Sequence, residues 1–397
     1  MAWWRNDGAL RRFVHDLVAT ELGRLRPGRP RLPERPWPDA LAIDADGLGA
    51  DSLELIELSG ALAEALGLGR SGLADVLLGR RTLGDWQATC RESLARFDDA
   101  IVFRSSGSTG APHPCRHTLA TLHQEVAALA TLLPASRILG AVPAHHIYGF
   151  LFTILLPQRL GAAVVELPRS GPAGLAGHLR PGDFVVAHPA YWRGVRRACD
   201  AVPGGVTGVT STAPCPPELF EDLRGAGFAR LVEIYGASET GGIGWRERPG
   251  PFTLLPHWTR DPRGERLLAR NPAGELAAVS PQDRLEWFSE RSFAVLTRHD
   301  GAVQVGGVNV FPERVRAMLR RHPLVADARV RLMRPLEGDR LKAFIVPHSE
   351  VDSPAARAAL AGWIDRELPV AERPRALTFG AALPIGPLGK PADWEIA

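Results

Sequence analysis

The pattern of apolar and polar positions divides the chain into three sections. In the first, residues 1–96, apolar residues recur at the spacing of an amphipathic helix. The earliest of them are Leu10, Phe13, Val14, Leu17 and Leu22. A stretch rich in Pro and Arg, GRPRLPERPWPDA, follows and predicts an extended surface connection. We expect this section to form a small α-helical module of four helices.

The second helix of this module is predicted to begin near residue 51 and to stop at Gly67, with Asp51 or Ser52 as its cap. Shorter helical pieces are expected at 73–78 and 83–94. The residues expected to line the buried face of the second helix are Leu53, Ile56, Leu62 and Leu66.

The section from 97 to 299 has a different pattern. Short apolar runs rich in Val, Ile and Phe alternate with helical stretches and Gly/Pro turns. The runs are AIVF, RILGAV, AAVVEL, DFVVAH, GVTGVTS and RLVEIYG. This alternation predicts a layered α/β core with mostly parallel strands.

The last section, 300–397, predicts a small α+β domain. Strands are expected at 328–332 and 341–347, and helices at 312–320 and 355–367, before a tail rich in Pro and Gly. The chain is therefore expected to be multidomain.

Charge and cysteine content narrow the function classes. The 47 basic and 44 acidic residues give a formal net charge of +3, a balance that does not indicate the dominant basic patch of a nucleic-acid binder. The four cysteines form no CxxC pair, so neither a zinc site nor a disulfide framework is predicted. The longest apolar stretch, near 150–156, is too short to span a bilayer, and the N-terminus has no apolar signal segment. These features predict a cytoplasmic protein without a membrane span.

Only two of the basic residues are lysine, Lys342 and Lys390; the other 45 are arginine. An ammonium group is a compact point charge and a guanidinium is a planar fork, so the two are not interchangeable. Lys342 lies in the apolar run LKAFIVP and is expected to be a surface residue that tolerates arginine. Lys390 ends the segment LPIGPLGK, close to the C-terminus.

The most informative motif is IVFRSSGSTGAP at 101–112. Its apolar run is followed by Ser and Gly residues, whose backbone N–H groups and hydroxyls can surround phosphate oxygens. No GK[ST] follows, so the motif is not a Walker loop, and it lacks the G-x-S-x-G spacing of a nucleophile elbow. It predicts a phosphate-binding loop, with an ordinary Ser/Gly turn as the alternative.

SSGSTGAP resembles the phosphate loop of the adenylate-forming superfamily, which includes acyl- and aryl-CoA synthetases. Further segments resemble other signatures of this superfamily in the same order. They are VPAHHIYG at 142–149, GVTSTAP at 208–214, IYGASETGG at 234–242, the region from Asp283 through Arg298 to GAVQVGGVNVFP at 301–312, and LPIGPLGK at 383–390.

The resemblance implies that a carboxylic acid attacks the α-phosphate of ATP and gives acyl-AMP and pyrophosphate. Positioning and charge neutralisation supply most of the catalysis in such chemistry. The implied nucleotide-binding residues are Ser106, Gly107, Ser108, Thr109, Gly110, Ser211, Thr212, Ala213, Tyr235, Gly236, Asp283 and Arg298.

Within this set the resemblance implies individual roles. Tyr235 stacks on adenine and Asp283 accepts hydrogen bonds from the ribose hydroxyls. Glu239 and Thr240 act at the α-phosphate, and Glu239 holds Mg²⁺ together with Thr109, since this hard cation prefers oxygen ligands. Lys390 is the catalytic lysine that bridges the carboxylate and phosphate oxygens.

The segment at 142–149 resembles the part of the family that lines the acyl pocket. Its candidate residues are His145, His146, Tyr148 and Gly149. A pocket lined by His and Tyr suits an aromatic or hydroxylated acid better than a long alkyl chain.

Two departures from the family pattern stand out. The family often has a lysine shortly after the phosphate loop, where this chain has His113-Pro114-Cys115-Arg116, and the chain is short. Its compact form resembles the AMP-ligases of aryl polyene and xanthomonadin pathways. Those enzymes activate hydroxyaryl acids, such as hydroxybenzoates, for a carrier protein.

LGADSLELIEL resembles the attachment motif of an acyl carrier protein, with Ser52 at the phosphopantetheine position. Glu54, Glu57 and Glu64 are the acidic residues at which a basic phosphopantetheinyl transferase is expected to dock. The alternative is a carrier-like module kept as a lid or docking piece, with Ser52 as a helix cap.

The sequence therefore predicts ATP-dependent adenylation of a hydroxyaryl acid such as 4-hydroxybenzoate. Transfer to a phosphopantetheine thiol, of CoA or of an acyl carrier protein, is expected to follow. ATP and Mg²⁺ are the expected cofactors, with 4′-phosphopantetheine on Ser52 if the module is a carrier. The alternatives are a degenerate nucleotide-binding scaffold that docks carriers, and a fatty-acyl ligase.

Overall fold

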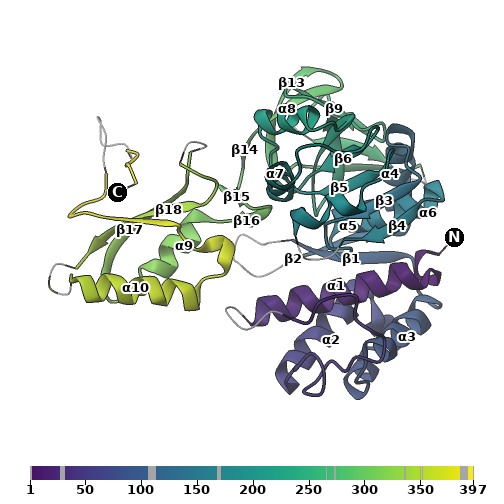
Figure 1. Ribbon diagram of the computed structural model, residues 1–397, viewed down its shortest axis with the longest axis horizontal. Helices are drawn as coiled ribbons and strands as arrows, with labels where there is room; N and C mark the ends of the chain where they lie inside the picture. Colours follow the sequence, from purple (N-terminus) through teal and green to yellow (C-terminus); the bar gives the residue numbers. More distant parts are fainter. Residues whose placement is uncertain are drawn as a thin grey trace. The chain divides into compact units, whose positions relative to one another are not determined.

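The computed structural model forms two compact units (Figure 1). It describes residues 2–26, 32–105, 113–167, 171–264, 266–271, 274–334, 337–348, 350, 352–384 and 392–396. The first unit is built from 2–25, 32–105 and 113–296, and the second begins at Thr297.

The helices that precede the sheet are fewer than predicted. In the described part of 2–96 they are α1 (Asp7–Leu25), α2 (Ser52–Leu66) and α3 (Leu83–Leu94), joined by the 3₁₀ turns η1 (Trp3–Arg5), η2 (Leu68–Ser71) and η3 (Asp75–Gly79). The helical piece expected at 73–78 is thus a 3₁₀ turn. Three α-helices, rather than four, form this part.

The cap and the buried face of α2 differ from the expected ones. Asp51, and not Ser52, is the cap: its side chain accepts from Glu54 N at 2.9 Å, and the Glu54 side chain accepts from Asp51 N at 3.0 Å. Leu53 and Ile56 are 74% and 53% exposed. The buried leucines are Leu55, Leu58, Leu62 and Leu66. A leucine-rich helix offers two apolar stripes, and packing against α1 and β1 selects the one that the spacing alone does not identify.

The N-terminal helices share one hydrophobic core with the α/β part. The ring of Phe150, from the α/β part, lies 5.1 Å from the ring of Trp3, 6.0 Å from that of Phe13 and 5.5 Å from that of Phe103. On α1, Asp16 accepts a hydrogen bond from Ala144 N at 2.7 Å. The boundary expected near residue 96 therefore does not coincide with a gap in the core.

A nine-stranded sheet forms the centre of the first unit, in the order β13-β14-β9-β8-β7-β6-β5-β3-β4. Its strands are β3 (Arg137–Gly140), β4 (Ala163–Glu166), β5 (Phe184–Ala187), β6 (Thr207–Thr210), β7 (Arg230–Ala237), β8 (Gly241–Arg246), β9 (Phe252–Leu254), β13 (Asp283–Ser289) and β14 (Ser292–Arg298). The neighbours from β4 to β7 pair in parallel, as predicted. The pairs β7–β8, β8–β9 and β9–β14 are antiparallel, which the sequence did not indicate.

Helices cover both faces of the parallel half. One face packs against α7 (Pro189–Ala198) and α8 (Pro217–Gly225), through Leu139 and Val185 of the sheet. Ile138 and Val186 point into the other core, together with α4 (Leu119–Leu132) and the helix formed by α5 (Ile147–Phe150), the π-turn η4 (Leu151–Leu155) and α6 (Leu156–Leu160). Burial on both faces explains why these strands read as continuous apolar runs.

Shorter elements complete the first unit. They are the hairpin β1 (Ala100–Ser105) and β2 (His113–Thr118), the three-stranded sheet β10 (Trp258–Arg260), β11 (Leu267–Arg270) and β12 (Leu276–Val279), and the 3₁₀ turns η5 (Pro172–Gly174) and η6 (Ala176–His178). The hairpin lies outside the nine-stranded sheet, although AIVF reads like the strands that enter it.

The second unit matches its predicted elements closely. It contains β15 (Val303–Val305), β16 (Val308–Val310), α9 (Pro312–Leu319), β17 (Val325–Leu332), β18 (Leu341–Pro347), α10 (Pro354–Glu367), η7 (Val370–Glu372) and β19 (Ala376–Phe379). Strand β19, which the sequence did not predict, pairs in parallel with β18.

Lys342, on β18, is not the surface residue that was expected. Its side chain is fully buried, with 0% exposure. The apolar run LKAFIVP is a central strand between β17 and β19, so a lysine within it is covered by neighbouring chain. Among the described residues, no helix has both the length and the apolar character needed to cross a bilayer.

We predict that Phe13→Ala lowers the free energy of unfolding of the whole first unit by roughly 3–5 kcal/mol, because it removes a fully buried ring that contacts Phe150. Urea unfolding followed by tryptophan fluorescence and by circular dichroism would measure the change. A single transition for 2–296 that shifts as one is expected. Hydrogen exchange of peptides assigns each transition to its residues. Loss of protection in 2–96 at lower urea, with the protection of 137–296 unchanged, would show that the N-terminal helices fold independently.

Candidate functional site

Three of the predicted motifs come together at one edge of the parallel strands. Parallel strands finish at the same edge of a sheet, and ligands of α/β proteins bind there. Strand β3 finishes at Gly140, β6 at Thr210 and β7 at Ala237. We call this end of the sheet the carboxyl edge. The loops that follow these strands carry three of the segments that resemble adenylate-forming enzymes.

The turn between β7 and β8 presents Glu239 and buries Thr240. The Thr240 hydroxyl donates to Gly241 O at 2.9 Å and accepts from Ala237 N at 3.2 Å. Gly236 has no room for a side chain, since a Cβ there would lie 2.2 Å from Gly241 O. The turn is therefore rigid at its base, while the Glu239 carboxylate is exposed and forms no ion pair with a described residue.

A buried acid on α4, Glu125, holds this turn in place. Its Oε1 accepts from Gly242 N at 2.8 Å, and Trp258 Nε1 donates to Gly242 O at 2.8 Å, so both backbone polar groups of Gly242 are engaged. Glu125 is 4% exposed, and this burial raises its pKa to about 8, against the lowering effect of the Gly242 hydrogen bond. Glu125 was not predicted from the sequence, although it is the one acid on the apolar face formed by Leu122, Val126 and Leu129.

The turn after β6 contains the strained residue Thr212. Its φ of 75° is the only positive value at a non-glycine position among the described residues, and a β-branched residue rarely adopts it. Ser211 Oγ donates to Ile234 O at 2.8 Å, which ties this turn to β7. Ala213 completes the turn and is half-buried.

Tyr235 and Asp283, both expected at the nucleoside, are in direct contact. The Tyr235 hydroxyl donates to Asp283 Oδ2 at 2.8 Å. The Tyr235 ring packs 5.6 Å from Phe252 and 5.7 Å from Phe293, between centroids. The fold thus brings an aromatic ring and a carboxylate together from strands 48 residues apart.

The expected pocket residues in the loop after β3 differ in how deeply they are buried. His145 is half-buried and His146 is exposed, with their ring centroids 4.1 Å apart. Tyr148 is buried and its hydroxyl donates to Ala187 O at 3.1 Å, so this group supports the end of β5. Gly149 is required by packing, because a Cβ would lie 1.9 Å from Pro143 O.

The predicted phosphate loop lies between two paired strands. Ser105 of β1 and His113 of β2 are partners in the hairpin register. The loop residues themselves, Ser106, Gly107, Ser108, Thr109 and Gly110, lie outside the described residues.

His117, a residue that the sequence analysis did not single out, connects this hairpin to the site. Its Nε2 donates to Ser238 O at 2.7 Å, next to Glu239. Burial lowers the pKa of His117, which keeps the ring neutral at physiological pH.

The two remaining candidates belong to the second unit. Arg298 donates two hydrogen bonds to Asp300, at 2.9 and 2.7 Å, and these hold the pKa of Asp300 below its usual range. Lys390 lies outside the described residues.

Magnesium fits the donors that the site offers. No cluster of three or more His, Cys, Asp or Glu residues able to hold a metal is found in the described part of the chain. Mg²⁺ keeps several waters and is bound through one or two carboxylates plus substrate phosphates. The exposed carboxylate of Glu239 meets that requirement, and the ion would supply charge neutralisation at the phosphates.

The family of the chain follows from its sequence. The model of the AMP-binding enzyme family matches residues 57–273, and that of the AMP-binding enzyme C-terminal domain matches residues 315–390. The chain belongs to the AMP-binding enzyme family and is an AMP-forming acid–thiol ligase. The first match begins inside α2, so it includes part of the section predicted to be carrier-like.

Two similar proteins are named as CoA ligases. The chain is 38% identical over 390 residues to a 4-coumarate–CoA ligase of Halorhodospira halophila, covering 97% of this chain and 98% of that one. It is 39% identical over 398 residues to a 4-coumarate–CoA ligase of Rhodobacter capsulatus, covering 97% and 100%.

Solved structures share the fold at low identity. The o-succinylbenzoate CoA synthetase of Bacillus subtilis superposes with a TM-score of 0.60 at 20% identity, over 74% of this chain and 68% of that one. The amide bond synthetase of Marinactinospora thermotolerans gives a TM-score of 0.59 at 18% identity, over 96% and 92%.

We predict that Glu125→Gln retains activity and removes a pH dependence of stability. The folded acid stays protonated up to about pH 8 while the unfolded acid ionises near 4.5, so stability of the wild type falls as pH rises through this window. Glutamine keeps an oxygen for Gly242 N but does not ionise. Urea unfolding at pH 5.5 and 8 should show a smaller loss in Glu125→Gln, and parallel losses would contradict the assignment.

We expect Glu125→Leu to behave differently from Glu125→Gln. Leucine leaves Gly242 N–H buried without its acceptor, at a cost of roughly 1–3 kcal/mol. The β7–β8 turn then loses its support, and the adenylation rate should fall with it. Equal rates for the two variants would exclude a role for this hydrogen bond.

Proposed function

We propose that this ligase joins a hydroxyaryl carboxylic acid, of the 4-coumarate or 4-hydroxybenzoate type, to CoA through an acyl-AMP intermediate. The observation that carries the proposal is the identity of 38–39% to 4-coumarate–CoA ligases over 97% of the chain. The polar groups collected at the carboxyl edge support it independently.

The adenylation step follows from these groups. A carboxylate oxygen of the acid forms a bond to the α-phosphorus of ATP, while the bond to the bridging oxygen breaks and pyrophosphate leaves. Glu239 and Thr240 act beside the α-phosphate, and Tyr235 and Asp283 hold the nucleoside. Lys390 supplies the ammonium that neutralises the two approaching oxygens, a task suited to a point charge.

The thiol step completes the reaction. The sulfur of CoA, as thiolate, attacks the carbonyl carbon of acyl-AMP, and AMP leaves with the electron pair of the C–O bond. The products are the aryl-CoA thioester, AMP and pyrophosphate. Relatives that align over almost their whole length are named CoA ligases, which favours CoA as the acceptor.

His145 and His146 support an aromatic acid as the substrate. Their rings are 4.1 Å apart in the loop after β3, at the carboxyl edge. Imidazole can stack on a planar ring and can hydrogen-bond to a phenolic hydroxyl. A hydroxyaryl acid uses both properties, whereas an alkyl chain uses neither.

Acyl transfer to Ser52-linked phosphopantetheine is the second candidate. Ser52 is exposed at the start of α2, beside the exposed Leu53 and Ile56. Against it, the acids expected to bind a transferase are engaged within the chain. Glu54 completes the α2 cap, and Glu64 pairs with Arg104 at 2.6 Å.

We expect acid-dependent exchange of labelled pyrophosphate into ATP with 4-coumarate or 4-hydroxybenzoate, and little with dodecanoate. Lys390→Ala should reduce the exchange by about 100-fold or more, because the transition-state charge loses its neutralising group, while ATP binding is kept. Lys342 is buried and is not a suitable control. Arg357→Met, which removes an ion pair with Asp352, serves as the control instead. Folded protein that exchanges with no aryl acid would contradict the proposal, and exchange with dodecanoate alone would favour a fatty-acyl ligase.

Mass spectrometry of the intact protein distinguishes the two acceptors. We expect no mass gain after incubation with CoA and a phosphopantetheinyl transferase, and formation of free aryl-CoA with the wild-type protein and with Ser52→Ala alike. A gain equal to phosphopantetheine that is lost in Ser52→Ala would instead establish a carrier in the same chain.

A further inference from the structure

The geometry points to Lys342 as a positioning residue for Lys390: it anchors the chain on the C-terminal side of Lys390 to strands β17 and β18. This inference rests on the proposed function, in which Lys390 acts in adenylation. The inference links the functions of Lys342 and Lys390, the only two lysines of the chain.

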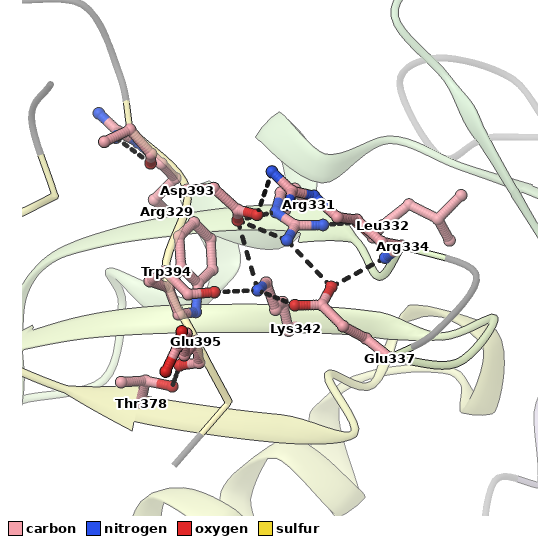
Figure 2. Close-up of polar contacts among 11 residues, drawn as sticks. Arg329, Arg331, Leu332, Arg334, Glu337, Lys342, Thr378, Asp393, Trp394 and Glu395 are labelled. Carbon is pink, nitrogen blue, oxygen red and sulfur yellow. Dashed lines mark hydrogen bonds and ion pairs between the residues drawn. The ribbon is translucent and has the colours of Figure 1, made fainter.

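The Lys342 ammonium is fully satisfied by the C-terminal tail and one loop (Figure 2). Its Nζ donates to Glu337 Oε1 at 2.6 Å and to the main-chain oxygen of Trp394, and it forms an ion pair with Asp393 Oδ1 at 3.3 Å. Three oxygens therefore surround an ammonium that has three N–H donors. Two of the three acceptors belong to residues 393–394, just beyond Lys390.

The Trp394 ring adds to this anchor. Lys342 Nζ lies 4.8 Å from the ring centroid, and the ring packs edge-on against Phe344 at 5.8 Å. The tail therefore covers Lys342 with both its backbone and an aromatic side chain, which accounts for the complete burial of the ammonium.

Charge balance requires the tail to be in place. Arg331 and Lys342 are directly opposite each other on β17 and β18, and like charges in that arrangement repel. Glu337 binds both of them, at 3.0 and 2.6 Å, and Asp393 of the tail binds both as well. Arg334 also pairs with Asp393, at 2.7 Å.

The pKa values of the two acids reflect this network. The pKa of Glu337 is lowered to about 2, and the hydrogen bond from Lys342 makes the largest contribution. Burial raises the pKa of Asp393, but hydrogen bonds from Arg331, Trp394 N and Lys342 outweigh it and lower this pKa to about 2 as well. Both acids are therefore ionised throughout the physiological range.

A second set of contacts holds the two ends of the segment that contains Lys390. Ala392 N donates to Pro384 O at 3.1 Å, so the chain on either side of 385–391 is hydrogen-bonded together. Arg329 of β17 donates to Pro384 O at 2.5 Å and to Ala392 O at 3.5 Å. Further along, Thr378 Oγ1 of β19 donates to Glu395 O at 3.4 Å.

Both ends of the Lys390 segment thus start from fixed points on the sheet. Arg329 holds the base, and Lys342 holds the tail through Asp393 and Trp394. A displacement of about 1 Å in a catalytic group can cost about 100-fold in rate. Release of the tail moves one of these fixed points and so should act on Lys390.

Arginine cannot replace Lys342 in this role. The site is enclosed and matches three single N–H donors to three oxygens around one nitrogen. A planar guanidinium is larger and directs its donors as a fork. The expectation that Lys342 tolerates arginine is thereby reversed.

The test compares Lys342→Met and Asp393→Asn in wild-type and Lys390→Ala backgrounds. Acid-dependent pyrophosphate exchange measures adenylation, and transfer from added acyl-AMP to CoA measures the second step. We expect each variant to lose about tenfold or more of the exchange but less than about twofold of the transfer step. In Lys390→Ala we expect no additional loss, since the effect passes through Lys390.

Several controls keep the result decisive. Asp393→Asn lies outside the sheet, so its loss of exchange is not a failure of β18 to fold. Arg357→Met removes the exposed pair with Asp352 in the same unit and should leave exchange unchanged. Exchange near the wild-type rate in both tail variants, equal loss in both steps, or an added loss in Lys390→Ala would each overturn the inference.

Hydrogen exchange separates this inference from the proposed function. Peptides covering 376–384 and 392–396 should lose protection in Lys342→Met and Asp393→Asn. In Arg357→Met, whose guanidinium also lies 4.4 Å from the Phe379 ring centroid, the peptide covering 392–396 should keep its protection. If the wild-type protein shows no acid-dependent exchange of pyrophosphate, the proposed function fails. In that case unchanged protection of 392–396 would also overturn the anchoring by Lys342.

Discussion

The arrangement of the site depends on the backbone of one buried residue, Gly242. Glu125 of α4 accepts a hydrogen bond from its N–H, and Trp258 of β10 donates one to its carbonyl. Because this backbone is fixed on both sides, the β7–β8 turn can pack closely against Gly236 and present Glu239 to solvent while it buries Thr240. The helix α4, the small β10–β12 sheet and the switch from parallel to antiparallel pairing all meet at this point.

This constraint also explains why the site is built from glycines. A Cβ at Gly241 or Gly242 would lie 2.3 or 2.6 Å from the Glu125 carboxyl oxygens. The glycines let a neutral, buried acid reach the backbone directly. If the β7–β8 turn acts at the phosphate as proposed, preorganised hydrogen bonds of this kind keep it from reorganising when charge develops there.

In the first unit a buried, neutral acid holds the backbone in place, whereas in the second unit ion pairs hold the tail. A central strand carries an ammonium that is neutralised by Asp393 of the C-terminal tail and by Glu337 of a loop. The tail is thereby tied to the sheet beyond Lys390. In the proposed mechanism the two lysines among the 47 basic residues have different tasks, and each task suits an ammonium better than a guanidinium.

The sequence predicted those helices and strands whose formation depends on the local pattern of apolar residues. Strands β3–β7 were predictable because strands buried on both faces read as apolar runs, and α9, α10, β17 and β18 were predictable from periodicity. The buried stripe of α2, the place of β1 outside the main sheet and the burial of Lys342 were not, since each depends on partners distant in sequence. Lys342 and Trp394 are 52 residues apart, and Glu125 and Gly242 are 117 apart.

Activation of the acid by direct attack on the α-phosphate of ATP is tested by an isotope experiment. The reaction is run with an aryl acid that carries ¹⁸O in both carboxylate oxygens, ATP, Mg²⁺ and CoA, and the nucleotide product is analysed by mass. Direct attack gives AMP with one ¹⁸O atom in its phosphate and unlabelled pyrophosphate. Unlabelled AMP, or ¹⁸O in inorganic phosphate with ADP as the nucleotide, would contradict it.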